Sequence, residues 1–387
     1  MSIKGKAFIA GVYEHPLRLV ENQSTPAIHA ECAKGALEDA GLSFEDVDGY
    51  FCAGDAPGGA LSMVDYLGLK VRHVDSTETG GSSYIAHVAH AAQAIASGKC
   101  SVALITMGGR PRAEGKDGTK PKKVEPNVPE TPFEQPYAPT AVNEYAMAAK
   151  LHMHKYGTTS EQMAWVKVAA SHHAQYNPNA RLKDVVTVED VLNSPMIADP
   201  LHLMDCCVVS DGGGAAVVVA PEIAKELNRP FIQISGAGES PQGPLGGYID
   251  MTHTGAVYSG KAAFEEAGMT PADIKYAGIY DSFTITVIMQ LEDLGFCKKG
   301  EGGKFVADGN LIAGQGSLPV NTDGGGLSNN HPTSRGGMTK LIEAVRQLRG
   351  EAHPKLQVEN CDVALVNGIG GGLGSRHCSA TLIMERV

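Results

Sequence analysis

The chain has 387 residues, which is long enough for a large hydrophobic core and about two domains. Hydrophobic residues make up 43% and charged residues 19% of it, as in ordinary soluble globular proteins. The net charge of −11 argues against non-specific binding to nucleic acid or to an anionic membrane surface. No apolar run is long enough to span a membrane, and no leader pattern opens the chain, so we expect a cytoplasmic protein.

The first part of the chain alternates apolar strands with amphipathic helices. Apolar runs bounded by glycines predict strands, and longer periodic segments predict helices. In chain order we expect a strand at 6–13, a helix at 27–40, a strand at 47–54, a helix at 82–97 and strands at 101–108 and 214–220. Continuous apolar strands of this kind are typical of a sheet covered by helices on both faces.

The second part repeats this order. It predicts a strand at 231–238, a helix at 258–267, a strand at 276–283, helices from 284 and at 335–349, and strands at 362–370 and 380–385.

Three pairs of segments indicate that the chain is an internal duplication. "ALEDAGLSFEDVDGY" (36–50) matches "AFEEAGMTPADIKYA" (263–277), including the helix-ending glycines Gly41 and Gly268. A second match joins 98–109 to 359–372, and a weaker third match joins 213–220 to 378–385. We therefore expect an α/β protein with two similar halves, residues 1–225 and 226–387.

Residues of about 110–205 have no counterpart in the second half and are interpreted as an insertion that lies over the sheets as a lid. The insertion begins with a basic, proline-rich stretch that is typical of an exposed loop. Two helical patterns follow, in the segments 143–157 and 160–180, and we expect their histidines, including His152 and His173, to be polar groups of the surface or lid.

Several separate motifs resemble those of the thiolase superfamily, in particular sterol-carrier-protein-type thiolases and thiolase-like acyl-CoA aldolases. The motifs are the strand-to-helix turn at 79–83, "HMHKYGTTSEQMA" (152–164), "MDCCVVSDGGGAAVVV" (204–219), "SNNHP" (328–332) and "NGIGGGLG" (367–374). The resemblance covers nearly the whole chain. It implies a duplicated, five-layered α-β-α-β-α fold, a homodimer and acyl-CoA substrates.

The chain departs from the family at three of four catalytic positions. By resemblance, the nucleophilic cysteine position falls on Gly81, or on Ser82 if the register slips by one. The second catalytic cysteine becomes Gly368, the asparagine of the family's "NEAF" motif becomes Tyr280, and the "GHP" histidine is retained as His331. The departures put acyl-enzyme chemistry in doubt, because a serine hydroxyl is a much weaker nucleophile than a thiol without a strong base.

The remaining groups suit chemistry on a thioester enolate. Backbone N–H groups of the two glycine-rich turns would form an oxyanion hole, with the residues Gly81, Ser82, Gly368, Gly370 and Gly371. Tyr280 and His331 would transfer protons. We therefore predict retro-aldol cleavage of a 3-hydroxyacyl-CoA, or the reverse aldol addition, as in the thiolase-like steroid side-chain aldolases that the chain resembles at the departing positions.

Two alternatives stay open. The first is an acyltransferase with a relocated nucleophile, Ser82 or Cys378, and the second is a non-catalytic acyl-CoA or lipid carrier. Ser83 is a further hydroxyl in the same turn, and Asp281 either orients a base, lines the ligand channel or makes a structural hydrogen bond.

The sequence also suggests ligands and partners. We expect coenzyme A as part of the substrate, no covalently bound cofactor and no metal, since no cysteine pair has the CxxC spacing. By resemblance, a small OB-fold and zinc-ribbon protein helps to complete the acyl-CoA channel. The lysines of the basic loop, Lys120, Lys122 and Lys123, are candidates for contacting the CoA 3′-phosphate.

Overall fold

A nine-stranded mixed sheet runs through the computed structural model, which describes residues 2–116, 129, 131–137, 140–227, 229–242, 250–332, 336–372 and 375–387. Its strand order is β3-β2-β4-β7-β1-β8-β11-β10-β9. The strands are β1 (Phe8–Glu14), β2 (Gly49–Phe51), β3 (His73–Asp75), β4 (Val102–Gly109), β7 (Gly212–Val219), β8 (Ile232–Gln242), β9 (Tyr276–Ile279), β10 (Val363–Gly372) and β11 (Ser375–Arg386). A separate small hairpin pairs β5 (Met196–Ala198) with β6 (Leu201–His202).

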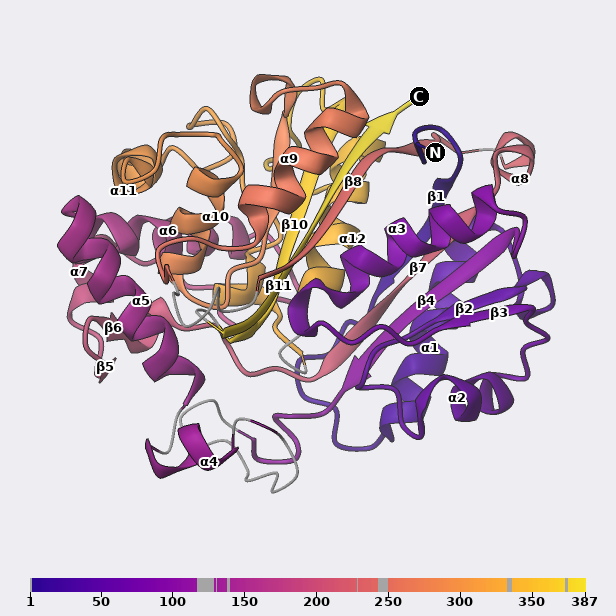
Figure 1. Cartoon of the computed structure of the whole chain (residues 1–387), viewed down its shortest axis with the longest axis horizontal. Helices are drawn as coiled ribbons and strands as arrows, with labels where there is room; N and C mark the ends of the chain where they lie inside the picture. The colour runs from indigo at the N-terminus through magenta and orange to yellow at the C-terminus, as the bar shows by residue number, and fades with distance from the viewer. Residues whose placement is uncertain are drawn as a thin grey trace.

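Helices cover both halves of this sheet and also fill the space between them (Figure 1). The outer face of the first half carries α1 (Thr25–Ala40) and α2 (Gly59–Leu67). The central layer consists of α3 (Ser83–Ala96) and α12 (Gly337–Arg349), whose buried residues pack against strands of both halves. The outer face of the second half carries α9 (Ala256–Ala267) and α10 (Thr284–Asp293). The expected five-layered α/β arrangement is confirmed.

The two halves also repeat each other at the level of single contacts. Both α1 and α9 end at a glycine in the left-handed conformation, Gly41 and Gly268, each with φ 71°. In β1, a β-carbon on Gly11 would lie 2.1 Å from the Ala36 carbonyl oxygen of α1. In β8, a β-carbon on Gly236 would lie 2.2 Å from the Ala263 carbonyl oxygen of α9. Each strand therefore requires glycine where its own half's first helix crosses it closely.

The halves are joined more directly than two separate sheets would be. β1 pairs with β8 through the register Phe8 with Gln233 and Ile9 with Ile232, so one continuous sheet crosses the boundary between the halves. The predicted boundary between residues 225 and 226 would fall within the short helix α8 (Pro221–Glu226), between β7 and β8.

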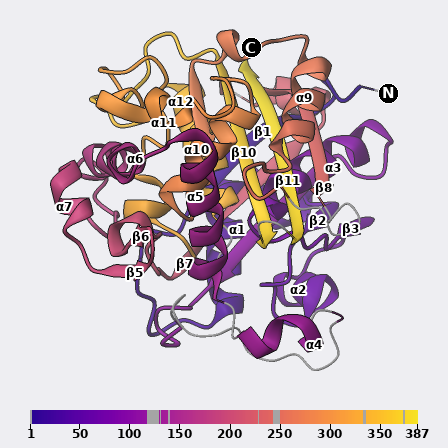
Figure 2. The same ribbon diagram turned by 60° about the vertical axis from the view of Figure 1, so that its left-hand side comes forward.

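The insertion contributes its main helices to the second half. α5 (Ala141–Tyr156) and α6 (Ser160–Ala174) share a buried cluster with α10, and Figure 2 shows them beside it. Shorter helices complete the described chain: α4 (Thr131–Glu134), α7 (Val188–Leu192) and α11 (Gly302–Val306).

The expectation that His152 and His173 are polar surface or lid residues is wrong, because both are buried. Lys120, Lys122 and Lys123 lie outside the described residues. None of the described helices has the length and apolar character needed to cross a membrane.

Candidate active site

The turn that begins α3 lies directly on the backbone of β10. A β-carbon on Gly370 would lie 1.7 Å from the Thr79 carbonyl oxygen, and one on Gly80 would lie 2.9 Å from the Gly371 nitrogen. A β-carbon on Gly368 would lie 3.0 Å from the Ser82 α-carbon. The two glycine-rich segments predicted from sequence are therefore brought together, and glycine is required because the backbones meet without room for side chains. Their role as an oxyanion hole stays a prediction.

Gly81 lies against the ring of Tyr280. A β-carbon on Gly81 would lie 2.3 Å from Tyr280 Cε2 and 2.4 Å from the Ile369 carbonyl oxygen. These separations are far below van der Waals contact. The tyrosine ring therefore occupies the space that a side chain at residue 81 would need.

Tyr280 and His331 form a buried hydrogen-bonded pair. The Tyr280 hydroxyl lies 3.0 Å from His331 Nε2, and the two residues are only 4% and 6% exposed. Tyr280 follows β9, where its N–H donates to the Asn367 carbonyl oxygen and its own carbonyl accepts from Gln290 Nε2 at 2.7 Å. These bonds fix the backbone from which the phenol projects.

Burial keeps the His331 imidazole uncharged near neutral pH. Desolvation, followed by repulsion from the Lys340 ammonium, lowers the pKa of His331 to about 4. A neutral imidazole carries one ring nitrogen that accepts a hydrogen bond and one that donates. In the tautomer whose Nε2 accepts, His331 can take the proton of the Tyr280 hydroxyl.

The backbone of His331 is held by a buried polar network. Its N–H donates to Ser210 Oγ at 2.9 Å, and Ser210 Oγ donates to Asn330 Oδ1 at 2.7 Å. Asn330 Nδ2 donates in turn to Glu14 Oε1 at 3.0 Å, and Glu14 pairs with Arg18 at 2.7 Å. Burial alone would raise the pKa of Glu14, but Arg18 and Arg346 lower it to about 2, so the carboxylate stays ionised as an acceptor.

Asp281 follows Tyr280 directly and bonds to the turn that precedes His331. Its carboxylate accepts from the Gly326 N–H at 2.8 Å and the Leu327 N–H at 3.2 Å. It also forms an ion pair with Lys340, whose Nζ lies 2.7 Å from Oδ1. Of the roles considered from sequence, these contacts favour the structural hydrogen bond.

The hydroxyls of the α3 turn are engaged within the turn itself. Ser82 Oγ donates to the Thr79 carbonyl oxygen at 2.8 Å and approaches Thr79 Oγ1 at 3.1 Å. Ser83 Oγ accepts from the Thr79 N–H at 2.9 Å. These bonds close the turn within residues 79–83.

No thiol in the chain is activated. All eight cysteines are free, and burial raises the pKa of every one of them, including Cys378 beside the Ser82 hydroxyl. A nucleophilic cysteine needs a lowered pKa so that the thiolate is populated. Among the residues that the structure describes, no three histidine, cysteine or acidic side chains gather as ligands for a metal ion.

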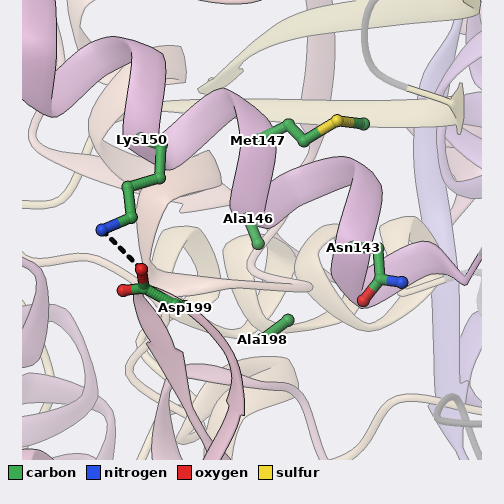
Figure 3. Close-up of a pocket in the computed structure, with 6 residues that line it drawn as sticks. All are labelled: Asn143, Ala146, Met147, Lys150, Ala198 and Asp199. Atoms are coloured by element: carbon green, nitrogen blue, oxygen red, sulfur yellow. Dashed lines mark ion pairs between the residues drawn. The ribbon is translucent and has the colours of Figure 1, made fainter.

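Figure 3 shows a pocket elsewhere, between α5 and the β5–β6 hairpin. Lys150 and Asp199 form an ion pair of 2.7 Å at its edge. None of the site residues predicted from sequence lines it. The pocket is lined by Asn143, Ala146, Met147, Lys150, Ala198 and Asp199.

Sequence reasoning missed Ser210, Lys167 and Lys340, all of which are buried around the turn before His331. The available signal was the placement of each lysine inside a helix among apolar and small residues, in "AWVKVAA" and "GMTKLI". A lysine in such a context is buried with a partner or lies at an interface.

Comparison with known proteins agrees with the motifs. The family model described as "Thiolase C-terminal domain-like" matches residues 246–386. The 17-hydroxy-3-oxo-4-pregnene-20-carboxyl-CoA lyase of Mycobacterium tuberculosis is 34% identical over 383 residues, which cover 95% of this chain and 98% of that protein. An acetyl-CoA acetyltransferase of Methanothermobacter thermautotrophicus is 34% identical over 352 residues, covering 89% and 91%.

A solved structure extends the comparison to three dimensions. A chain of the "Ltp2-ChsH2(DUF35) aldolase" structure superposes with a TM-score of 0.88 at 32% identity, covering 99% of this chain and 98% of that one.

Proposed function

This chain belongs to the thiolase superfamily, and we propose that it is an acyl-CoA lyase, which cleaves the C2–C3 bond of a 3-hydroxyacyl-CoA by a retro-aldol reaction. The observation that carries the proposal is the buried Tyr280–His331 pair beside Gly81. It supplies a proton-transfer group where a thiolase would need a nucleophile. The similarity to a CoA-ester lyase and to an aldolase supports the same chemistry.

The proposed reaction uses the pair as a proton relay. The Tyr280 oxygen takes the proton of the substrate's 3-hydroxyl while His331 Nε2 takes the phenolic proton. The C2–C3 bond then breaks, and its electron pair forms the enolate of the shortened thioester. Return of the proton through Tyr280 to C2 yields an acyl-CoA and a ketone or aldehyde, and leaves the enzyme unchanged.

The glycine-rich segments are the proposed binding site for the thioester oxygen. The close packing of Gly80 against Gly370 and Gly371, and of Gly370 against the Gly81 nitrogen, supports this role, because these contacts are made by backbone atoms. Oriented N–H donors would stabilise the charge that develops on the enolate oxygen.

An acyltransferase is the second candidate, because a relative of equal identity is an acetyl-CoA acetyltransferase. The geometry disfavours it. Residue 81 has no side chain, the Ser82 hydroxyl donates to Thr79, and the pKa of the Cys378 thiol is raised by burial. An acyl-transfer reaction would require the Ser82 hydroxyl or the Cys378 thiol to become a nucleophile.

We also propose a homodimer and a small partner protein with an OB-fold and zinc ribbon. β3 is an edge strand, and no other strand in the described part of the chain pairs with its outer side. An exposed edge of this kind favours pairing with a second copy. The name of the similar aldolase, "Ltp2-ChsH2(DUF35) aldolase", joins a second component to the thiolase-like chain, which supports a partner. Light scattering of the protein alone, and with a DUF35 protein added, tests both associations.

The test of the lyase activity uses a panel of 3-hydroxyacyl-CoA esters with steroid, aryl or short alkyl groups at C3. We expect a shortened acyl-CoA and a free carbonyl product in equal amounts, with one deuterium at C2 of the acyl-CoA when the reaction runs in deuterium oxide. Intact-protein mass after incubation with acetoacetyl-CoA is the control. A covalent acyl group on the protein, with thiolysis by free CoA, would contradict the proposal and favour the acyltransferase.

A further inference from the structure

Lys340 is a fully buried cation close to the Tyr280–His331 pair. It lies in the first turn of α12, its side chain is 0% exposed, and Nζ lies 2.7 Å from Asp281 Oδ1. Burying an ammonium group without a partner is strongly unfavourable. A lysine can therefore be buried at this position only because Asp281 pairs with it.

The carboxylate of Asp281 also shapes the turn that leads to His331. Gly325–Asn329 forms one turn of π-helix, called here the 325–329 turn, and Asp281 accepts the N–H groups of Gly326 and Leu327. Gly325 has φ +60°, and a β-carbon on it would lie 2.1 Å from Asp281 Oδ2. The turn therefore wraps around the carboxylate, and its glycines allow the close approach.

Gly326 connects the ion pair to the catalytic imidazole. A β-carbon on this residue would lie 2.9 Å from Asp281 Oδ1 and 3.0 Å from His331 Cδ2. A second buried lysine, Lys167 on α6, donates to the Leu327 carbonyl oxygen at 2.7 Å and to Ser328 Oγ at 2.8 Å. The turn is thus bonded on both sides, and a shift of Asp281 would move the backbone against which the His331 ring packs.

We propose that Lys340 and Asp281 are positioning residues, which act through the 325–329 turn to hold His331 at hydrogen-bond distance from the Tyr280 hydroxyl. The proposal rests on the lyase function proposed above for its kinetic consequences, but not for its structural ones. Neither residue is assigned a contact with substrate.

The charge of Lys340 has a second consequence for His331. Its ammonium contributes, after burial, to the low pKa of the imidazole, so loss of the charge raises that pKa. A variant that changes only Lys340 keeps all the other charged or titratable residues around His331 and the 325–329 turn. These are Tyr280, Asp281, Asp323, Lys167 on α6, and Glu14 and Arg18 beside the Asn329–Asn330 segment.

The test compares Lys340→Met with the wild-type protein. We expect kcat for the retro-aldol reaction to fall about 10- to 100-fold with KM changed less than about threefold, because a misplaced proton-transfer group lowers kcat and not ground-state binding. The acid limb of the pH–kcat profile should move to higher pH. The His331 imidazole signals, followed by NMR without substrate, should titrate at higher pH by about one unit or more.

Two further variants separate positioning from general destabilisation. Arg349→Met breaks another ion pair of α12, between the buried Arg349 and the half-buried Asp39 at 2.8 Å, and should leave kcat and the His331 titration unchanged. The double variant Asp281→Asn, Lys340→Met removes both charges of the Lys340–Asp281 pair together, so neither of these two groups is left buried without its partner, and it should still show the raised His331 pKa.

The proposal is overturned if His331 titrates in Lys340→Met and in the double variant as it does in the wild type. It is also overturned if kcat is unchanged in an active enzyme. If the wild-type protein cleaves none of the esters, the lyase function fails, and the proposal is then decided by the Tyr280–His331 hydrogen bond, followed by NMR of the exchangeable protons of both side chains: a hydrogen bond unchanged in Lys340→Met and in the double variant would overturn the positioning role.

Discussion

The ring of Tyr280 occupies the space that a side chain on Gly81 would need: a β-carbon on Gly81 would lie 2.3 Å from Cε2 of the tyrosine ring. The two residues therefore depend on each other: the large ring at residue 280 fits only because residue 81 has no side chain. In the proposed function, this phenol, hydrogen-bonded to His331, takes the place of the nucleophile that a thiolase would carry at the start of α3.

Gly81→Cys is expected to inactivate the protein and not to create a thiolase. The new side chain would collide with the Tyr280 ring, so we expect the free energy of unfolding to fall by about 1–3 kcal/mol, as for overpacked cores. Chemical denaturation and the lyase assay measure the two effects.

The double variant Gly81→Cys, Tyr280→Asn is the matched control, because the smaller residue relieves the collision with the ring and leaves only the contact with the Ile369 carbonyl oxygen. We expect it to recover stability relative to Gly81→Cys. Equal stability of the two variants would mean that the ring does not occupy the place of a side chain at residue 81.

Ser82→Ala is expected to retain catalysis. The Ser82 hydroxyl donates to the Thr79 carbonyl oxygen within the turn, so its removal costs about 1 kcal/mol of stability and leaves kcat within about threefold of the wild type. Steady-state kinetics on a cleaved ester measure the effect. A hundredfold loss of kcat with normal stability would point to Ser82 as a nucleophile.

His90 is expected to stabilise the fold in a pH-dependent way. Its Nδ1 lies 2.7 Å from Asp75 on β3 and its Nε2 lies 2.9 Å from Glu239 on β8, and these two hydrogen bonds raise the pKa of His90 to about 9. The folded-state pKa exceeds the unfolded value of about 6.5, so the stabilisation is complete below that pH and is lost as the pH rises through about 9.

Thermal unfolding of the wild type and His90→Gln between these pH values measures this effect. The difference in Tm should be largest at the acid end of the range and should shrink toward the alkaline end. A difference that stays constant with pH would show that the charge of His90 is not involved.

Local patterns predicted much of the fold. The apolar runs and the helix-ending glycines Gly41 and Gly268 located most of the strands and helices, because these signals depend on neighbouring residues. The pairing of β1 with β8 through Phe8 and Ile9 was not predictable, because register between distant strands depends on how the halves pack.

The candidate site was predictable where it followed motifs. Tyr280 was found because it departs from the residue type that the family has at its position, and His331 because it retains the family's histidine. The structure brings these two residues together. The partners of Lys340 and of His152 were not predictable, because each partner lies far away along the chain. Lys340 is paired with Asp281, and His152 Nε2 lies 2.9 Å from Glu292.

The most direct test of the account is the retro-aldol rate of Tyr280→Phe, measured in a single turnover on a 3-hydroxyacyl-CoA that the wild type cleaves. Tyr276→Phe is the matched control, because it removes a buried hydroxyl from β9 of the same segment and should be active. We predict that Tyr280→Phe binds the ester normally but cleaves it about 10²- to 10⁴-fold more slowly, the usual contribution of a general acid–base group. Cleavage by Tyr280→Phe at the wild-type rate would contradict the central claim that the phenol transfers the proton.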